Sequence, residues 1–408
     1  MKFPPLSIAL IGLALALLTV KDLQEIADIR VLSLAIPIFI VSAYAERLWD
    51  LVLPKSVLAY IVVSCIILPL VSIMTKGALS IYEPYLIMTV LCGYILVAVP
   101  YSLLDKDMEW LGNMYLGAIL VMCWFCYLTF QRQWFGSYVM RTFSDSRTFF
   151  ALQASIAVPF LHGRHRNFLR VFMLITLFMT NSRLSFFLAL FVVIFQMFKE
   201  DKDQFIRLAP VFSALFAVFL LGTAAGNLML SKMSNLANLG SADYLADAPD
   251  ASDIGRLAYI ATTIEQIDSE RVVLLGHGIK TNHIIIGEYL DTSAWGLDPT
   301  MADAAVHNVY LELVSDTGLL GLVPYVICIL YVGFTIAWYH GIQSKYFISF
   351  SIFVISYMFE GNYVTFFFQY AVMYFLFVAY QARLGRVAPL SLSSDCLSRS
   401  RLVEEDYS

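Results

Sequence analysis

The stretch that decides the fold is residues 307–338, HNVYLELVSDTGLLGLVPYVICILYVGFTIAW. Its second half is an apolar run long enough to cross a hydrocarbon layer of about 30 Å. Its first half places His307, Asn308 and Glu312 directly before that run. Because the bilayer makes buried polar groups costly, such residues are rarely placed at its edge without a use. The stretch therefore predicts a helix that enters a membrane from a polar loop, with functional side chains at the entry point.

The composition of the whole chain agrees with a membrane protein. Of its 408 residues 60% are hydrophobic and only 14% are charged, whereas soluble domains are about half apolar and about a quarter charged. Apolar segments of spanning length recur along nearly the whole chain, so no ordinary soluble domain is left over. The basic residues are scattered and form no patch, which argues against a nucleic-acid partner.

The apolar segments predict an all-α, polytopic transmembrane bundle of about twelve spans. Residues 1–224 hold spans one to nine, 225–306 form a large outer loop, 307–380 hold a re-entry helix and the last three spans, and 381–408 form a tail expected to be disordered. Loops this long are usually functional or disordered. Apolar spacing at 257–267 and 306–316 predicts amphipathic helices in and after this loop. The candidate spans lie near 5–20, 31–45, 56–74, 84–104, 112–130, 148–162, 167–180, 184–198, 208–224, 318–338, 346–359 and 363–380.

The distribution of Lys and Arg predicts the orientation. With the N-terminus in the cytoplasm, most basic residues of the short segments fall on the cytoplasmic side, as the positive-inside rule requires. They include Arg164, Arg166, Arg170, Arg383, Arg386, Arg399 and Arg401. Both termini are then cytoplasmic, and the large loop faces outward.

Three features fall on the predicted outer side. Arg183 ends the short turn Thr180–Arg183, Arg256 opens the amphipathic stretch of the loop, and His307 precedes the re-entry. Each has an ordinary explanation: a snorkelling arginine, a solvated arginine and a structural histidine. Together they suit chemistry at a diphosphate, because guanidinium groups bind it through paired hydrogen bonds and an imidazole can accept a hydroxyl proton near neutral pH.

These residues carry a resemblance to a family. The chain resembles the O-antigen ligase and O-antigen polymerase superfamily of bacterial inner-membrane glycosyltransferases. The matching pieces are Asn-Ser-Arg at 181–183, Gly255-Arg256, Leu275-Gly276-His277-Gly278, and the block from His307-Asn308 through Glu312 to Gly318-Leu319-Leu320-Gly321. They cover residues 180–325 as motifs, and the span layout extends the resemblance over the whole chain.

The resemblance implies a transferase that uses a glycan carried on undecaprenyl diphosphate at the periplasmic face, with inversion, without a cofactor and without a required metal. Arg183 and Arg256 would hold the diphosphate, and His307 would be the general base on the acceptor hydroxyl or would position it. The remaining candidates for substrate binding are Asn308, Glu312, Arg147, Arg141 and His277. Glu312 could orient the imidazole or support the fold there.

The alternatives differ in acceptor or in class. A ligase passes the glycan to lipid A–core, whereas an O-antigen, capsule or exopolysaccharide polymerase passes it to a second lipid-linked glycan. The Leu275–Gly278 segment favours a polymerase slightly, and the position of the large loop favours a ligase slightly. A metal-dependent oligosaccharyltransferase would need early outer carboxylates, for which Asp22, Glu25 and Asp28 are candidates. A transporter would place polar groups at mid-membrane, and the spans here carry few charges.

Overall fold

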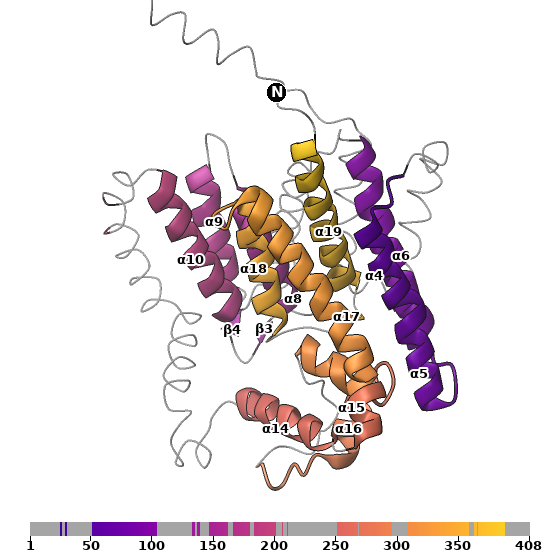
Figure 1. Cartoon of the computed structure of the whole chain (residues 1–408). Helices are drawn as coiled ribbons and strands as arrows, with labels where there is room; N and C mark the ends of the chain where they lie inside the picture. Colours follow the sequence, from indigo (N-terminus) through magenta and orange to yellow (C-terminus); the bar gives the residue numbers. More distant parts are fainter. Residues whose placement is uncertain are drawn as a thin grey trace, which may run out of the picture.

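The computed structural model is almost entirely helical over the residues that it describes (Figure 1). These residues are 25–26, 29–30, 51–103, 133–134, 137–138, 147–161, 166–179, 183–200, 206, 210, 251–267, 269–295, 308–358, 363–364 and 366–387. Two antiparallel pairs of two-residue strands accompany the helices: β1 (Glu25–Ile26) with β2 (Ile29–Arg30), and β3 (Gln133–Trp134) with β4 (Ser137–Tyr138). The predicted helical class is confirmed, and the count of about twelve spans stays a prediction.

Three helical stretches of the described chain are long and apolar enough to cross a membrane: Lys55–Lys76, Tyr82–Ser102 and Val309–His340. The first consists of α4 (Lys55–Val62), a π-helical turn (Val63–Ile67) and α5 (Leu68–Lys76), and the second lies in α6 (Tyr82–Leu103). Gly77, with φ 72°, ends α5 in the left-handed conformation that glycine adopts without strain. Both stretches coincide with predicted spans, at 56–74 and 84–104, which supports the prediction of a membrane protein.

Two further groups of helices follow this pair. One holds α8 (Arg147–Ala157), a 3₁₀ turn (Val158–Phe160), α9 (Arg166–Met179) and α10 (Arg183–Glu200). The other holds α17 (Val309–His340), α18 (Lys345–Tyr357) and α19 (Phe366–Val387); this second group packs on the pair, and the first group packs on α18 of the second. The bidentate ion pair between buried Arg170 and Glu200, at 2.8 and 2.9 Å, joins the start of α9 to the end of α10. The core within the second group, between α18 and α19, is rich in aromatic side chains: Phe353 contacts Tyr357, Phe368 and Phe375.

The large loop forms helices at one end of the bundle. These are α14 (Ala251–Glu265), α15 (Glu270–Leu275) and α16 (Asn282–Tyr289), and Figure 1 shows them below the membrane helices, beside the end of α5 and the start of α17. We call this the loop end. At the opposite end Lys199 Nζ donates to the carbonyl of Gln343, 3.5 Å away, in the turn after α17. Helix α10 therefore ends at the opposite end and begins at the loop end.

The re-entry helix expected at 306–316 and the span expected at 318–338 are the two parts of α17, which a kink at Gly318, with non-helical φ 61° and ψ −160°, separates as expected. Two other expectations differ from the structure in their boundaries. The amphipathic helix expected at 257–267 is α14, which starts six residues earlier, at Ala251. Helix α19 continues to Val387, into the tail expected from residue 381. The rest of that tail and the predicted spans 5–20, 31–45 and 112–130 lie outside the described residues.

Candidate functional site

The segment after α15 lies backbone against backbone on the start of α17. A Cβ atom on Gly276 would come within 2.4 Å of the Asp316 carbonyl carbon, and one on Gly318 within 2.3 Å of the Leu274 carbonyl carbon. Both glycines have positive φ, 71° and 61°. The amides of His277 and Gly278 donate to the carbonyls of Ser315 and Asp316 at 2.8 and 2.7 Å. Only residues without a side chain permit this approach, because any Cβ would displace backbone.

Two carboxylates on this part of α17 hold Lys280. Glu312 and Asp316 are four residues apart and so share a helix face. Lys280 Nζ lies 2.6 Å from Glu312 Oε1, and the Lys280 amide donates to Asp316 Oδ2 at 2.8 Å. Lys280 has φ 62°, a left-handed conformation that is uncommon for a residue with a side chain. The pairing with Asp316 explains why the backbone keeps this conformation.

A buried polar network continues from Asp316. Its Oδ1 accepts from the Asn282 amide at 3.3 Å, and its Oδ2 accepts from the Tyr363 hydroxyl at 3.1 Å. The Asn282 side-chain amide donates to Thr263 of α14 and Ser315 of α17, at 3.1 and 3.3 Å. Asp316 thus connects the loop, α17 and the segment before α19. Buried networks of this kind rigidify a structure when they are satisfied.

The same loop segment is bound from its other side by α5. Lys76 Nζ donates to the Ile279 carbonyl and pairs with Glu83 Oε1 at 3.1 Å. Ser72 Oγ accepts from the Ile279 amide at 2.8 Å and donates to Glu83. Residues 276–282 are therefore held between two membrane helices that are distant in sequence.

Three of the predicted site residues have described side chains, and each has a partner. Asn308 is the N-cap of α17, where its Oδ1 accepts from the amides of Tyr310 and Leu311, both at 3.0 Å. Glu312 pairs with Lys280, and its Oε2 is buried with no hydrogen-bond partner among the described residues. A ring nitrogen of half-buried His277 lies 3.2 Å from the Gln266 carbonyl.

The predicted arginines are placed by their helices. Arg183 is the first residue of α10, so it lies at the loop end, and Arg256 lies within α14 at the same end (Figure 1). Arg147 is the first residue of α8. The side chains of these three arginines lie outside the described part of the structure, as do all of His307 and Arg141. His307 directly precedes the cap residue Asn308, so the chain brings it to the start of α17.

Helix α14 is held on the loop by a small apolar cluster. Its Ala258 and Tyr259 pack on Ile286 and Leu290, which belong to α16 and its C-terminal cap. Burial raises the pKa of the Tyr259 hydroxyl above its usual value. A Cβ on Gly255 would meet the Tyr259 hydroxyl at 3.2 Å. Gly255, which directly precedes Arg256, is therefore packed against Tyr259 within the loop. This packing holds the backbone of α14 at Arg256.

The residues that join these elements were not singled out from the sequence. Lys280, Asp316, Asn282 and Tyr363 form the network, and Lys76 anchors it to α5. The sequence did hold one indication that Asp316 matters. It follows Glu312 by four residues, on the same helix face, and precedes Gly318 and Gly321. The partners of that face come from remote segments, which spacing alone does not identify.

These observations define a helical membrane protein whose large loop folds onto one end of the bundle and is held there by buried polar contacts. Within this chain, residues 168–326 match the model of the O-antigen ligase family. The resemblance inferred from the motifs is confirmed over these residues. A comparison with curated proteins finds no match.

The family match bears on function at a general level. It indicates activity of the O-antigen ligase type, in a family of glycosyltransferase-like ligases and polymerases that act on lipid-linked glycans. The matched region runs from α9 into α17 and includes Arg183, Arg256, the loop helices and the network residues Lys280, Asn282 and Asp316.

Proposed function

We propose that the protein is an inverting glycosyltransferase that moves a glycan from undecaprenyl diphosphate to an acceptor hydroxyl at the periplasmic face, as an O-antigen ligase acting on lipid A–core. One observation carries the proposal: within the matched region, the start of α10, helix α14 and the start of α17 all lie toward the loop end of the bundle. These are the elements that bear Arg183, Arg256 and His307.

The chemistry suits these residue types. The acceptor oxygen attacks the anomeric carbon while the bond from that carbon to the diphosphate breaks, and the hydroxyl proton passes to His307. The leaving diphosphate gains negative charge in the transition state, which is when the fixed charges of Arg183 and Arg256 stabilise it most. Arg141, Arg147 and His277 would contact the donor glycan or its headgroup. The scheme needs neither a metal nor a cofactor.

The buried network supports the proposal because it holds the start of α17, the helix that His307 precedes. His307 precedes the N-cap of α17, and the first turns of that helix are held by Lys280 and by the backbone contact at Gly276. A base must lie within hydrogen-bond reach of the proton that it accepts, so a rigid support is expected beneath it. Asn308 and Glu312 would then act mainly by positioning His307.

The proposed setting is the bacterial inner membrane, with both termini cytoplasmic and the loop end in the periplasm. The positive-inside count supports it, and among the counted residues Arg170, near the start of α9, and Arg383, near the end of α19, lie at the end opposite the loop. The donor carries its diphosphate at the membrane surface, which is where the loop end would meet it.

A deletion strain tests the choice of acceptor. If the protein is the ligase, the lipopolysaccharide gel shows core without O antigen, and full-length polymer accumulates on undecaprenyl diphosphate. If it is instead the polymerase, the core carries a single repeat unit. Unchanged lipopolysaccharide together with loss of a capsule or exopolysaccharide would assign the protein to that polymer. Complementation with the wild-type chain is the control.

A further inference from the structure

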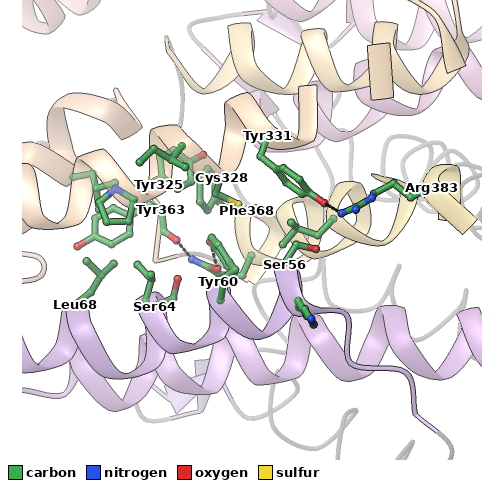
Figure 2. A pocket seen from close by; sticks show the side chains of 18 residues that line it. Ser56, Tyr60, Ser64, Leu68, Tyr325, Cys328, Tyr331, Tyr363, Phe368 and Arg383 are labelled. Carbon is green, nitrogen blue, oxygen red and sulfur yellow. Dashed lines mark hydrogen bonds between the residues drawn. The ribbon is translucent and has the colours of Figure 1, made fainter. Parts of the chain in front are cut away.

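A cavity of about 550 Å³ lies between α4, α17 and α19 (Figure 2), and Tyr363 of the loop network lines it at one end. Figure 2 shows Leu68, Ser64, Tyr325 and Tyr363 toward one end of it, and Ser56, Tyr331 and Arg383 at the other. Because Lys76 reaches the loop through Ile279, the start of α4 lies at the opposite end of the bundle. The cavity therefore runs from the loop end toward the opposite end.

The walls of the cavity are mainly apolar and extend far along the helices. On α17 the lining runs from Leu313 to Tyr331, a rise of about 27 Å at 1.5 Å per residue, which is close to the thickness of a hydrocarbon core. Such a surface suits a lipid chain lying along the helix. The apolar lining residues are Ala59, Val63, Leu68, Leu313, Pro324, Ile327, Phe368 and Leu376.

Two cations line the cavity at the opposite end. Lys55 is the first residue of α4, and the exposed Arg383 donates through Nη1 to the Tyr331 hydroxyl at 3.1 Å. Among the described residues that line the cavity, none is acidic. A guanidinium oriented by a neighbouring hydroxyl, beside an ammonium group, is suited to bind a phosphate.

Besides the two cations, the wall holds a polar group without a hydrogen-bond partner among the described residues. The Tyr325 hydroxyl is buried, lines the cavity and has no hydrogen-bond partner among the described residues. It lies six residues before Tyr331, about 9 Å along the helix. By contrast, the Tyr60 hydroxyl in the same wall is satisfied by Gln369 at 2.7 Å. Because a buried hydroxyl without a partner is costly, a ligand with an acceptor below its phosphate would satisfy Tyr325.

We propose that this cavity binds an anionic glycerophospholipid, with its phosphate on Lys55 and Arg383, an ester oxygen near Tyr325 and an acyl chain along α17. Basic pockets between membrane helices recognise anionic headgroups in this way. Undecaprenyl diphosphate, the donor proposed above, does not fit this position. Its diphosphate is assigned to the loop end, whereas Lys55 and Arg383 lie at the opposite end. The inference does not depend on the transferase activity.

Native mass spectrometry tests it on the full-length wild-type protein. The protein in detergent is titrated separately with phosphatidylglycerol and with phosphatidylethanolamine of identical acyl chains. We expect retained adducts with phosphatidylglycerol at concentrations where phosphatidylethanolamine gives few. Equal retention of the two lipids would overturn the proposal, as would adducts of a polyprenyl phosphate that phosphatidylglycerol does not displace.

Variants then locate the lipid. The double variant Lys55→Gln/Arg383→Gln should lower phosphatidylglycerol retention by roughly ten- to thirty-fold, the effect expected of two cations near a membrane surface. Tyr331→Phe, which keeps both cations, should lower it less. The matched control is Lys199→Gln, an exposed lysine at the same end that does not line the cavity. Retention that falls equally in the control and the double variant would contradict this location.

Discussion

Lys280 and Glu312 form an ion pair, with 2.6 Å between Nζ and Oε1, that joins the large loop to the first turn of α17. The Glu312 side chain is 2% exposed and that of Lys280 is 15% exposed. Glu312 lies five residues beyond His307 in the sequence. The ion pair therefore connects the loop to the start of α17, which His307, the proposed base, directly precedes.

Glu312→Gln should destabilise the protein. It leaves the Lys280 ammonium without its carboxylate partner, and removing one member of a buried pair costs about 3 kcal/mol. Thermal unfolding in detergent, followed by fluorescence, measures the loss. Glu265→Gln is the control, because Glu265 is exposed on α14 and such changes stay within about 0.5 kcal/mol. Equal unfolding temperatures for the two variants would show that the ion pair contributes nothing.

Gly276→Ala should be far more damaging than Gly77→Ala. The two glycines have nearly the same φ, 71° and 72°, but their ψ angles are −167° and 2°. An alanine at position 77 bears the strain of the left-handed region, about 1 kcal/mol, whereas one at position 276 would occupy a region that is essentially restricted to glycine. Only at position 276 would the new methyl group collide with backbone, at 2.4 Å from Asp316, whereas nothing lies within 4 Å at Gly77. Unfolding temperature and yield of folded protein measure the difference. If the two variants behave alike, the close packing of the loop on α17 is wrong.

Variants of Asn308 separate capping from substrate contact. Asn308→Ala removes the acceptor for the Tyr310 and Leu311 amides and should cost about 1 kcal/mol. Asn308→Ser keeps a capping oxygen and should restore most of the stability. If Asn308 acts only through the cap, glycan transfer should follow stability across the two variants. Transfer that is lost in a stable Asn308→Ser protein would instead assign Asn308 to the substrate.

The proposed mechanism predicts that a metal chelator has no effect. Two arginines supply the positive charge on the leaving diphosphate, so transfer by the purified protein should be the same with and without EDTA. The assay measures transfer of a radiolabelled glycan from undecaprenyl diphosphate. Loss of transfer with EDTA, reversed by Mg²⁺ or Mn²⁺, would favour the metal-dependent alternative that uses early carboxylates.

The sequence predicted the helical architecture well where the signal is local. Apolar length identified the spans near 56–74 and 84–104, and apolar spacing identified a helix at α14. The boundary between the helix expected at 306–316 and the span expected at 318–338 also agrees with the structure, where non-helical Gly318 separates the two parts of α17. The sequence did not show that the backbone of Leu274 packs against this glycine.

The contacts of the candidate site could not be predicted in the same way. Glu312 was expected to orient an imidazole or to support the fold there, but its partner Lys280, 32 residues earlier in the chain, was not identified. The Lys76 contact with Ile279 spans 203 residues. Such pairs depend on how the loop docks against the membrane helices, and neither helical periodicity nor motif spacing contains that information. The glycines around His277 did indicate a sharp turn, and the structure adds that they permit contact with α17.

Glycan transfer by reconstituted variants tests the central claim most directly. The assay compares four purified proteins: wild type, His307→Ala, Arg256→Ala and Arg271→Ala. Each receives an undecaprenyl diphosphate-linked glycan and lipid A–core, and the initial rates of transfer are compared among proteins that unfold at the same temperature. Arg271 is the matched control, an exposed arginine of the same loop on α15. We predict that transfer falls at least about a hundredfold in the His307 and Arg256 variants, the usual size of a lost general base or charge-stabilising group, and is unchanged in Arg271→Ala. Wild-type rates in His307→Ala and Arg256→Ala would contradict catalysis at the loop end.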